Sequence, residues 1–315
     1  MTDRTVWING SLGGRLDPFD RGFLLGDGVF DTAVAIGRVP FAGDRHIARL
    51  VGHAAAIGIA LDGASVRAGW SALLEAAGLE CAILRTTVTR GSSGRGVRPD
   101  ADPAPTIHVS AAPWNADLIG RPVRLVTAAA RRNETSPLSR LKAVGYLDNI
   151  LAMREAVAAG ADDALFLNGA GRVACTTIAN LFVLAGSRLA TPPQEEGILA
   201  GIMRGLVMET ATPLGLEVEE RSLGVDDLRE ADEVLLTNSV RFVFPVRSLD
   251  GVPVGSRRAD LAAALIDALL ARVREACGHD PRLRAAPERI GDAVGPDQSN
   301  AATSSRARAK ASRKS

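Results

Sequence analysis

Lysine is almost absent from this 315-residue chain: Lys142, Lys310 and Lys314 are the only three among 37 basic residues. Arginine carries the remaining positive charge, but its guanidinium cannot lose a proton or form an imine as a lysine amine does. Tyrosine is scarcer still, and the single one, Tyr146, follows Lys142 by four positions. The sequence therefore singles out Lys142 as a candidate reactive amine. The alternative is a solvated lysine left by chance in an arginine-rich protein.

Cysteine and histidine are also rare. The three cysteines are odd in number and widely spaced, which argues against a disulfide framework and a zinc site. The four histidines show no metal-ligand spacing, although two of them share one predicted helix. We therefore expect no metal site. These residues are Cys81, Cys175, Cys277, His46, His53, His108 and His279.

Long apolar runs and excess charge of one sign are missing as well. No run approaches the roughly 18–20 residues of a membrane span, and Met1–Arg4 lacks a signal pattern. The net charge of +1 gives no overall field for nucleic acid. We expect a cytoplasmic protein that binds neither membrane nor nucleic acid. The basic segment 295–315 could touch acidic surfaces, but a solvated tail is the favoured interpretation.

Hydrophobic periodicity and turn residues predict a mixture of strands and helices without regular alternation. This mixed α/β (α+β) order argues against a doubly wound parallel sheet. Asp44 is expected to cap the first long helix. The predicted strands are 6–8, 11–12, 29–36, 38–41, 82–89, 106–111, 123–127, 164–167, 180–184, 216–221, 233–237 and 242–246, and the predicted helices are 44–57, 65–78, 146–159, 202–210 and 258–277.

The pattern also predicts two domains. Residues 1–112 form a small N-terminal α/β domain, and the Pro/Gly-bounded stretch 113–122 forms a linker. Residues 123–278 form a larger C-terminal domain. Residues 279–315 are interpreted as a disordered basic tail.

Five motifs follow one another in the chain: Asp20–Thr32, His46-Ile47-Ala48-Arg49-Leu50, Lys142–Asn149, Asn180-Leu181-Phe182 and Gly201-Ile202-Met203-Arg204. In this order they resemble the class IV aminotransferases, the fold-type IV pyridoxal-phosphate (PLP) enzymes. This group includes branched-chain and D-amino-acid aminotransferases and aminodeoxychorismate lyase. The likeness covers roughly residues 5–255.

The resemblance implies a two-domain fold with PLP in the interdomain cleft, usually as a homodimer. Lys142 would hold PLP as a Schiff base and move a proton during catalysis. Arg49, the Ile202-Met203 backbone and Ser239 would bind the phosphate, and Tyr146 the ring oxygen. Phe30, Arg85 and Arg95 would lie on the substrate side. Without the resemblance, Arg49 would be interpreted as a surface salt bridge on a helix.

One position departs from the family. By register, Cys175 stands where the family has a glutamate that pairs with the pyridine nitrogen. A thiol is only a weak donor to an unprotonated nitrogen, so the cofactor would be a weaker electron sink. The alternatives are that Cys175 is a small buried apolar residue, or that Thr176 or Thr177 is the true partner.

Three functions remain open. The first is a transaminase that moves an amino group between an amino acid and a 2-oxo acid. The second is aminodeoxychorismate lyase, favoured by the segments Thr89–Gly96 and Leu236–Ser239. The third is a PLP-binding protein with impaired catalysis, suggested by Cys175. The family tyrosines of branched-chain enzymes are missing, with Ile83 at one of their positions, and Val97 stands at the D-amino-acid histidine position.

Overall fold

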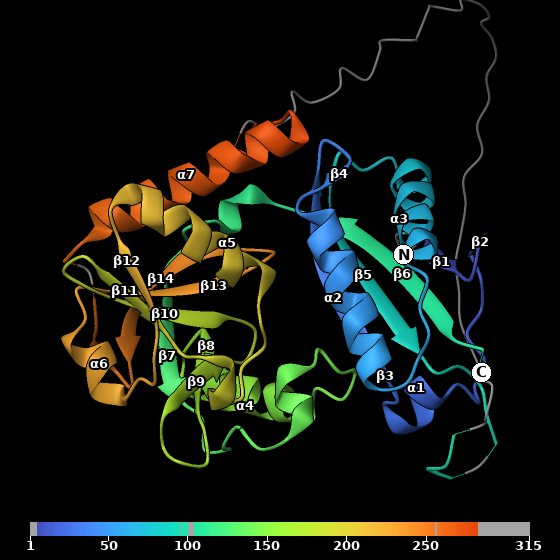
Figure 1. The fold of residues 1–315 in the computed structure, drawn as a ribbon, viewed down its shortest axis with the longest axis horizontal. Coiled ribbons are helices and arrows are strands. Elements are labelled where there is room, and N and C mark those ends of the chain that lie inside the picture. The colour runs from blue at the N-terminus through green and yellow to red at the C-terminus, as the bar shows by residue number, and fades with distance from the viewer. Residues whose placement is uncertain (1–4, 95, 100–103, 256, 283–315) are drawn as a thin grey trace, which may run out of the picture. The chain divides into compact units, whose positions relative to one another are not determined.

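The computed structural model describes residues 5–94, 96–99, 104–255 and 257–282. Their strands form two sheets (Figure 1), and the predicted mixture of strands and helices is confirmed. Within these ranges no helix is long and apolar enough to cross a membrane. The predictions for Arg95 and for tail residues 283–315 lie outside the described residues.

The first sheet has six strands in the order β2-β1-β6-β5-β3-β4, all antiparallel to their neighbours. Helices α2 and α3 bury their apolar faces against it in one core with Trp7, Val29 and Leu84. The short helix α1 precedes β3. The bounds are β1 Val6–Ile8, β2 Ser11–Leu12, α1 Arg21–Leu25, β3 Gly28–Ile36, β4 Val39–Pro40, α2 Gly43–Ala56, α3 Gly63–Ala77, β5 Cys81–Thr89 and β6 Thr106–Pro113.

The second sheet has nine strands and mixes parallel with antiparallel pairs. Its order is β12-β11-β10-β13-β14-β7-β8-β9, with β15 paired to β14. The bounds are β7 Val123–Thr127, α4 Leu147–Ala158, β8 Asp163–Leu167, β9 Val173–Thr176, β10 Asn180–Ala185, β11 Arg188–Thr191, α5 Ile202–Ala211, β12 Glu217–Glu220, α6 Val225–Glu230, β13 Glu233–Asn238, β14 Phe242–Leu249, β15 Val252–Pro253 and α7 Ala259–Cys277.

One apolar core joins the two sheets. Helices α5 and α7 pack on the second sheet, and the same cluster contains Val34, Ile36 and Phe41 from the first. Trp114, in the predicted linker, is also buried there and packs on Phe242 with 5.8 Å between ring centroids. The predicted domain boundaries stay a prediction; the first sheet ends at Pro113 and the second begins at Val123.

A backbone pairing links residue 142 to the first sheet. Strand β4 pairs only with the last two residues of β3, so the beginning of β3 would be an open edge. There the Phe30 amide donates to the Lys142 carbonyl at 2.8 Å, and the Val144 amide donates to the Gly28 carbonyl at 3.0 Å. Lys142–Val144 therefore covers this edge with a short antiparallel bridge, Val29 to Ala143.

One predicted cap is wrong. Ala42, in the left-handed conformation, is the N-cap of α2, whereas Asp44 lies in the first helical turn. The Asp44 side chain is exposed and pairs with Arg67 at 2.5 Å. The helix starts earlier because the turn from β4 already leads into it at Gly43.

Candidate active site

A cavity of about 640 Å³ lies between residues of both sheets. It contains Lys142 and every predicted site residue except Arg95, which is not among the described residues. No Asp or Glu side chain lines it in the part of the chain that the structure describes. Five cationic side chains do: Arg49, Arg85, Arg132, Lys142 and Arg241. The cavity is therefore suited to a ligand with several negative charges.

Lys142 projects into this cavity from the segment that covers β3. Its Nζ lies 4.3 Å from the centroid of the Phe30 ring and 5.6 Å from that of Tyr146. Burial of the amine and the nearby charge of Arg49 lower the pKa of Lys142 to about 8, against the opposing effect of Asp31. About a tenth of the amine is then unprotonated at pH 7, far more than for an ordinary lysine, and the unprotonated amine is the nucleophile.

Arg49 reaches the cavity from α2, and a buried carboxylate fixes it. Its Nε and Nη2 both lie 2.8 Å from Oδ2 of Asp31, and Nη1 donates to the Ala200 carbonyl at 3.3 Å. Nδ1 of His46 contacts Oδ1 of the same carboxylate at 2.6 Å. Burial alone would raise the pKa of Asp31, but Arg49 and His46 hold it well below its usual range. The Arg49 side chain is only 9% exposed, so a surface salt bridge is excluded.

The start of α5 lines the same cavity and offers its first backbone amides as donors. The first amides of a helix have no partner within the helix, and the N-cap Gly201 supplies no side chain. A Cβ at Gly201 would overlap with Oδ1 of Asn180, so the close approach there requires glycine. Ser239 lines the cavity, and the buried hydroxyl of Thr237 beside it has no hydrogen-bond partner among the described residues. This end can bind an anion.

Aromatic and cationic groups stack at the other side of Lys142. The Arg85 guanidinium lies 3.8 Å from the centroid of the Phe30 ring, so one ring contacts two cations. Tyr146 packs edge-on against Phe30 with 5.3 Å between centroids. Burial raises the pKa of Tyr146, so its hydroxyl stays protonated and can donate a hydrogen bond.

Cys175 lies on β9 and lines the cavity. It is 7% exposed and packs in a small core with Phe166, Ile198 and several alanines. Burial raises the pKa of the Cys175 thiol, and the charge of nearby Arg132 partly opposes this effect. The thiol is therefore neutral at ordinary pH. The neighbouring Thr176 and Thr177 also line the cavity.

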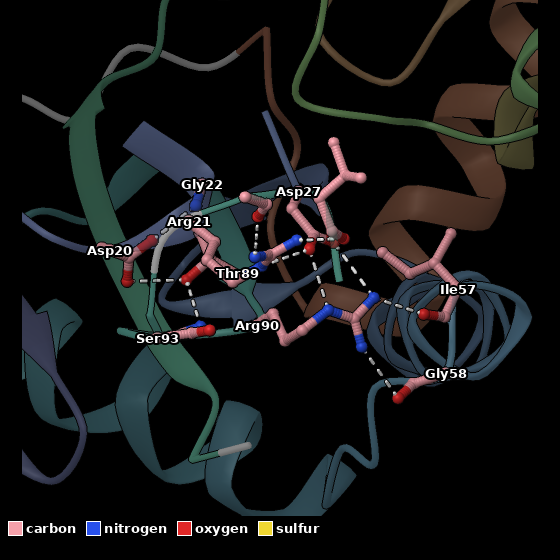
Figure 2. Close-up of polar contacts among 12 residues, drawn as sticks. Asp20, Arg21, Gly22, Asp27, Ile57, Gly58, Thr89, Arg90 and Ser93 are labelled. Atoms are coloured by element: carbon pink, nitrogen blue, oxygen red, sulfur yellow. Dashed lines mark hydrogen bonds and ion pairs between the residues drawn. The ribbon is translucent and has the colours of Figure 1, made fainter. Parts of the chain in front are cut away.

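The described residues of the N-terminal signature before Phe30 do not line the cavity. They instead make polar contacts within the first sheet and its helices (Figure 2). Asp20 caps α1 by accepting from the Gly22 amide at 2.7 Å. Asp27 binds both Arg21 and Arg90, each at 2.8 Å. Arg90 also donates to the Ile57 carbonyl at 2.6 Å, which ties β5 to the end of α2.

Sequence reasoning missed several polar residues around the cavity, among them Asp31, His53, Arg132, Thr237 and Arg241. One signal was available. His46, Arg49 and His53 are spaced i, i+3 and i+7, which places them on one face of a helix. A polar face on an otherwise core-facing helix predicts a site, but the partners of these residues, Asp31 on β3 and the backbone of Lys142, are not predicted by any local pattern.

Known proteins resemble the chain over most of its length. The family model for amino-transferase class IV matches residues 28–249. The chain is 33% identical to a provisionally named branched-chain-amino-acid aminotransferase of Methanocaldococcus jannaschii over 80% of this chain and 90% of that protein. It is 30% identical to aminodeoxychorismate lyase of Bacillus subtilis over 79% of this chain and 87% of that protein.

Solved structures of similar proteins have the same fold over most of the chain. The T.th. branched-chain amino acid aminotransferase complexed with N-(5'-phosphopyridoxyl)-L-glutamate superposes with a TM-score of 0.79 at 26% identity, covering 88% of this chain and 95% of that one. The chain belongs to the class IV aminotransferase family, a family of enzymes with both aminotransferase and lyase members. The expected family and fold are confirmed.

Proposed function

We propose that this enzyme binds pyridoxal 5'-phosphate through Lys142 and transfers amino groups between amino acids and 2-oxo acids. The observation that supports this most directly is a buried lysine of lowered pKa in a cavity whose other charged lining residues are arginines. PLP carries a phosphate, an anionic ring oxygen and an aldehyde. When bound, it supplies an electron sink for the bonds at the substrate α-carbon.

The residues present fit that group. Arg49, the Ile202 and Met203 amides and Ser239 offer donors for the phosphate, and we add the unpartnered hydroxyl of Thr237. Tyr146 is suited to donate to the ring oxygen. Cys175 is assigned to the pyridine-nitrogen side.

Lys142 is the one described lining residue suited to carry a proton between substrate carbon and cofactor near neutral pH, because burial and Arg49 lower the pKa of its amine to about 8. Phe30 and Arg85 are assigned to the substrate side, where the guanidinium can pair with a carboxylate. Arg95 is also predicted to lie on the substrate side.

Aminodeoxychorismate lyase is the second candidate. The lyase relative and the cationic cavity support it, because that substrate carries two carboxylates. A protein of impaired catalysis stays an alternative because of Cys175. A cytoplasmic location stays a prediction.

A spectroscopic assay separates these functions. The PLP-loaded enzyme is mixed in turn with D-alanine, L-leucine and L-glutamate, and conversion of the cofactor to its amine form is followed by absorbance. A transaminase should convert with at least one donor and revert with an oxo acid. A lyase should instead release pyruvate from 4-amino-4-deoxychorismate without an oxo acid. If the PLP-loaded protein shows neither reaction, the remaining interpretation is a PLP-binding protein with impaired catalysis.

Substitution of Cys175 by glutamate should speed proton exchange at the α-carbon of bound amino acids. Glu at this position would hold a proton on the ring nitrogen, and Arg132 offers the new carboxylate a nearby positive charge. A barrier lowered by about 1.4 kcal/mol gives a roughly tenfold faster exchange. Exchange is measured by NMR in deuterated water.

Cys175→Gln is the matched control, since it has the size of glutamate without the charge. Equal exchange rates in the two variants would contradict the assignment and favour Thr176 or Thr177 as the nitrogen partner. Loss of PLP from both variants would show that the alanine-rich surroundings of Cys175 have no room for a longer side chain.

The homodimer is also a proposal, and an exposed apolar surface supports it. In α1, Phe23, Leu24 and Leu25 are 79%, 55% and 51% exposed, and in α4, Leu147 and Leu151 are 69% and 49% exposed. The segment that follows α1 approaches the segment that precedes α4, because a Cβ at Gly26 would lie 3.7 Å from the Gly145 amide. Exposed apolar side chains on two neighbouring segments are expected to be covered, and we assign a second copy of the chain to this surface.

Charge placed in this patch should prevent association. Phe23→Glu combined with Leu147→Glu is expected to convert a dimer into a monomer in analytical ultracentrifugation. Val252→Glu, at an apolar residue of β15 that is 53% exposed, is the control and should leave the dimer intact. A wild-type monomer, or an unaffected double variant, would contradict the proposal.

A further inference from the structure

The polar face of α2 contains one histidine that the assignments above do not use. His46 and Arg49 both bind Asp31, whereas His53 lies one turn further along the same face, in the last turn of the helix. His53 is half-buried, and its Nδ1 accepts a hydrogen bond from the backbone amide of Lys142 at 3.2 Å. A side chain of the first 60 residues therefore binds the main chain of the candidate catalytic lysine.

With this hydrogen bond, both the carbonyl and the amide of Lys142 have partners. The Lys142 carbonyl accepts from the Phe30 amide at 2.8 Å, and the bridge continues through Val144 to the Gly28 carbonyl at 3.0 Å. The Lys142 amide has no strand partner in this bridge, so His53 supplies its acceptor. Without that acceptor, a partly buried amide would lose its partner, at a cost comparable to a lost hydrogen bond.

His53 is in the correct protonation state for this contact. Nδ1 can accept only when it carries no proton. Burial and the charges of Arg49, on its own helix, and of Lys142 lower the pKa of His53 to about 4, while Asp31 on β3 opposes the shift. The imidazole is therefore neutral throughout the ordinary working range. Its proton is on Nε2, which fixes the tautomer.

We propose that His53 is a positioning residue for Lys142: its Nδ1 fixes the main chain from which the reactive amine projects. The inference rests on the proposed function only in the role given to Lys142. The contact itself is a property of the protein without cofactor. His53 touches neither the substrate side nor the anion end of the cavity, so it acts through Lys142.

The matched variants are His53→Asn and His53→Gln. An asparagine amide can occupy the place of Nδ1, whereas a glutamine amide reaches the place of Nε2. His53→Leu removes the acceptor altogether. Melting temperature identifies variants that fold. Because Asn and Gln are both polar, their comparison remains decisive even where the leucine variant does not fold.

The first readout is the pH profile of Lys142 labelling by trinitrobenzenesulfonate in the full cofactor-free chain, followed by peptide mass spectrometry. Lys310 and Lys314 in the same digest control for reagent and pH. When the amine relaxes away from Arg49, Arg85 and Arg132, its titration should move about one pH unit towards that of an ordinary lysine. At pH 7.5, labelling of Lys142 should then fall roughly fivefold to tenfold in the Gln and Leu variants, with Asn close to wild type.

The second readout uses the PLP-loaded enzyme. The pH at which its visible absorption changes should shift in His53→Gln and not in His53→Asn, and kcat should fall with KM little changed. Equal behaviour of the Asn and Gln variants in both readouts, or a wild-type profile in a folded leucine variant, would overturn the proposal. If wild type cannot be fixed to PLP at Lys142, the proposed function fails, while the labelling comparison still decides the role of His53.

Discussion

Lys142→Arg should abolish turnover while leaving the protein folded. The guanidinium keeps the positive charge in the cavity but cannot lose its proton to attack an aldehyde or carry a proton from carbon. We expect a loss of at least about a thousandfold in rate, the scale of a missing acid–base group, together with loss of the covalent attachment of PLP. Borohydride treatment of wild type should fix the cofactor to Lys142, and mass spectrometry identifies the labelled peptide.

The other lysines make this test unambiguous. Lys310 and Lys314 are the only other lysines in the chain, so the label can be assigned from a single digest. Label found on one of them, or none after reconstitution with PLP, would contradict the central assignment. Lys142→Arg removes the reactive amine but keeps the charge, whereas Lys142→Met removes both. Comparison of the two variants therefore separates the loss of the amine from the loss of the charge.

Lys142→Met also has an expected effect on stability. The pKa of about 8 in the folded protein lies below the ordinary value near 10.5, so folding disfavours the charged amine. The unfolded chain then binds more protons, and this cost is fully present below about pH 8 and vanishes as pH rises through about 10.5. At pH 7, the cofactor-free methionine variant should be more stable by on the order of 2 kcal/mol in urea unfolding.

Arg49→Ala should produce the second large effect, a loss of PLP affinity of about 2–4 kcal/mol, or roughly thirtyfold to a thousandfold. The side chain is nearly buried, and its alignment by Asp31 means that little ordering is required when an anion binds. Affinity is measured by titrating the cofactor-free protein with PLP and following absorbance or tryptophan fluorescence.

Removal of Arg49 also leaves the buried Asp31 carboxylate without its arginine partner and with the His46 contact, so stability must be controlled. Arg49→Lys keeps the charge but not the planar fork, and should lose less affinity than alanine. The double variant Arg49→Ala with Asp31→Asn removes the uncompensated carboxylate. Restored folding with affinity still low would support the phosphate assignment. Unchanged affinity in Arg49→Ala would leave Arg49 only as the partner of Asp31.

The sequence predicted the long elements well because their signals are local. The largely apolar run of β3, the β-branched residues of β5 and the apolar stripe of α7 each extend over many residues, and the structure has these elements within two residues of the predicted bounds. The short helix α1 and the strand β11 were missed, because five and four residues give too little periodicity.

The residues of the site also fall into those that the sequence predicts and those that it does not. Lys142 and Arg49 could be found from composition and motif order, and the cavity contains both. The carboxylate that aligns Arg49 and the histidine that binds the Lys142 amide lie 18 and 89 residues from their partners. The first contact depends on how α2 packs on β3, and the second on how the segment at Lys142 lies along β3, and no local sequence pattern predicts either arrangement. The role of Cys175 depends on register at the end of β9 and stays a prediction.

The bridge between Lys142–Val144 and β3 has a consequence for aggregation. An uncovered strand edge presents unpaired amides and carbonyls to other chains, and proteins usually protect such edges. Here the three residues that present the reactive amine are also the cover of the open part of β3. A substitution that releases this segment should therefore reduce activity and expose a β edge in the same step. Loss of turnover on storage or mild heating should be accompanied by the appearance of intermolecular β-structure, and a bound ligand that holds Lys142 in place should delay both.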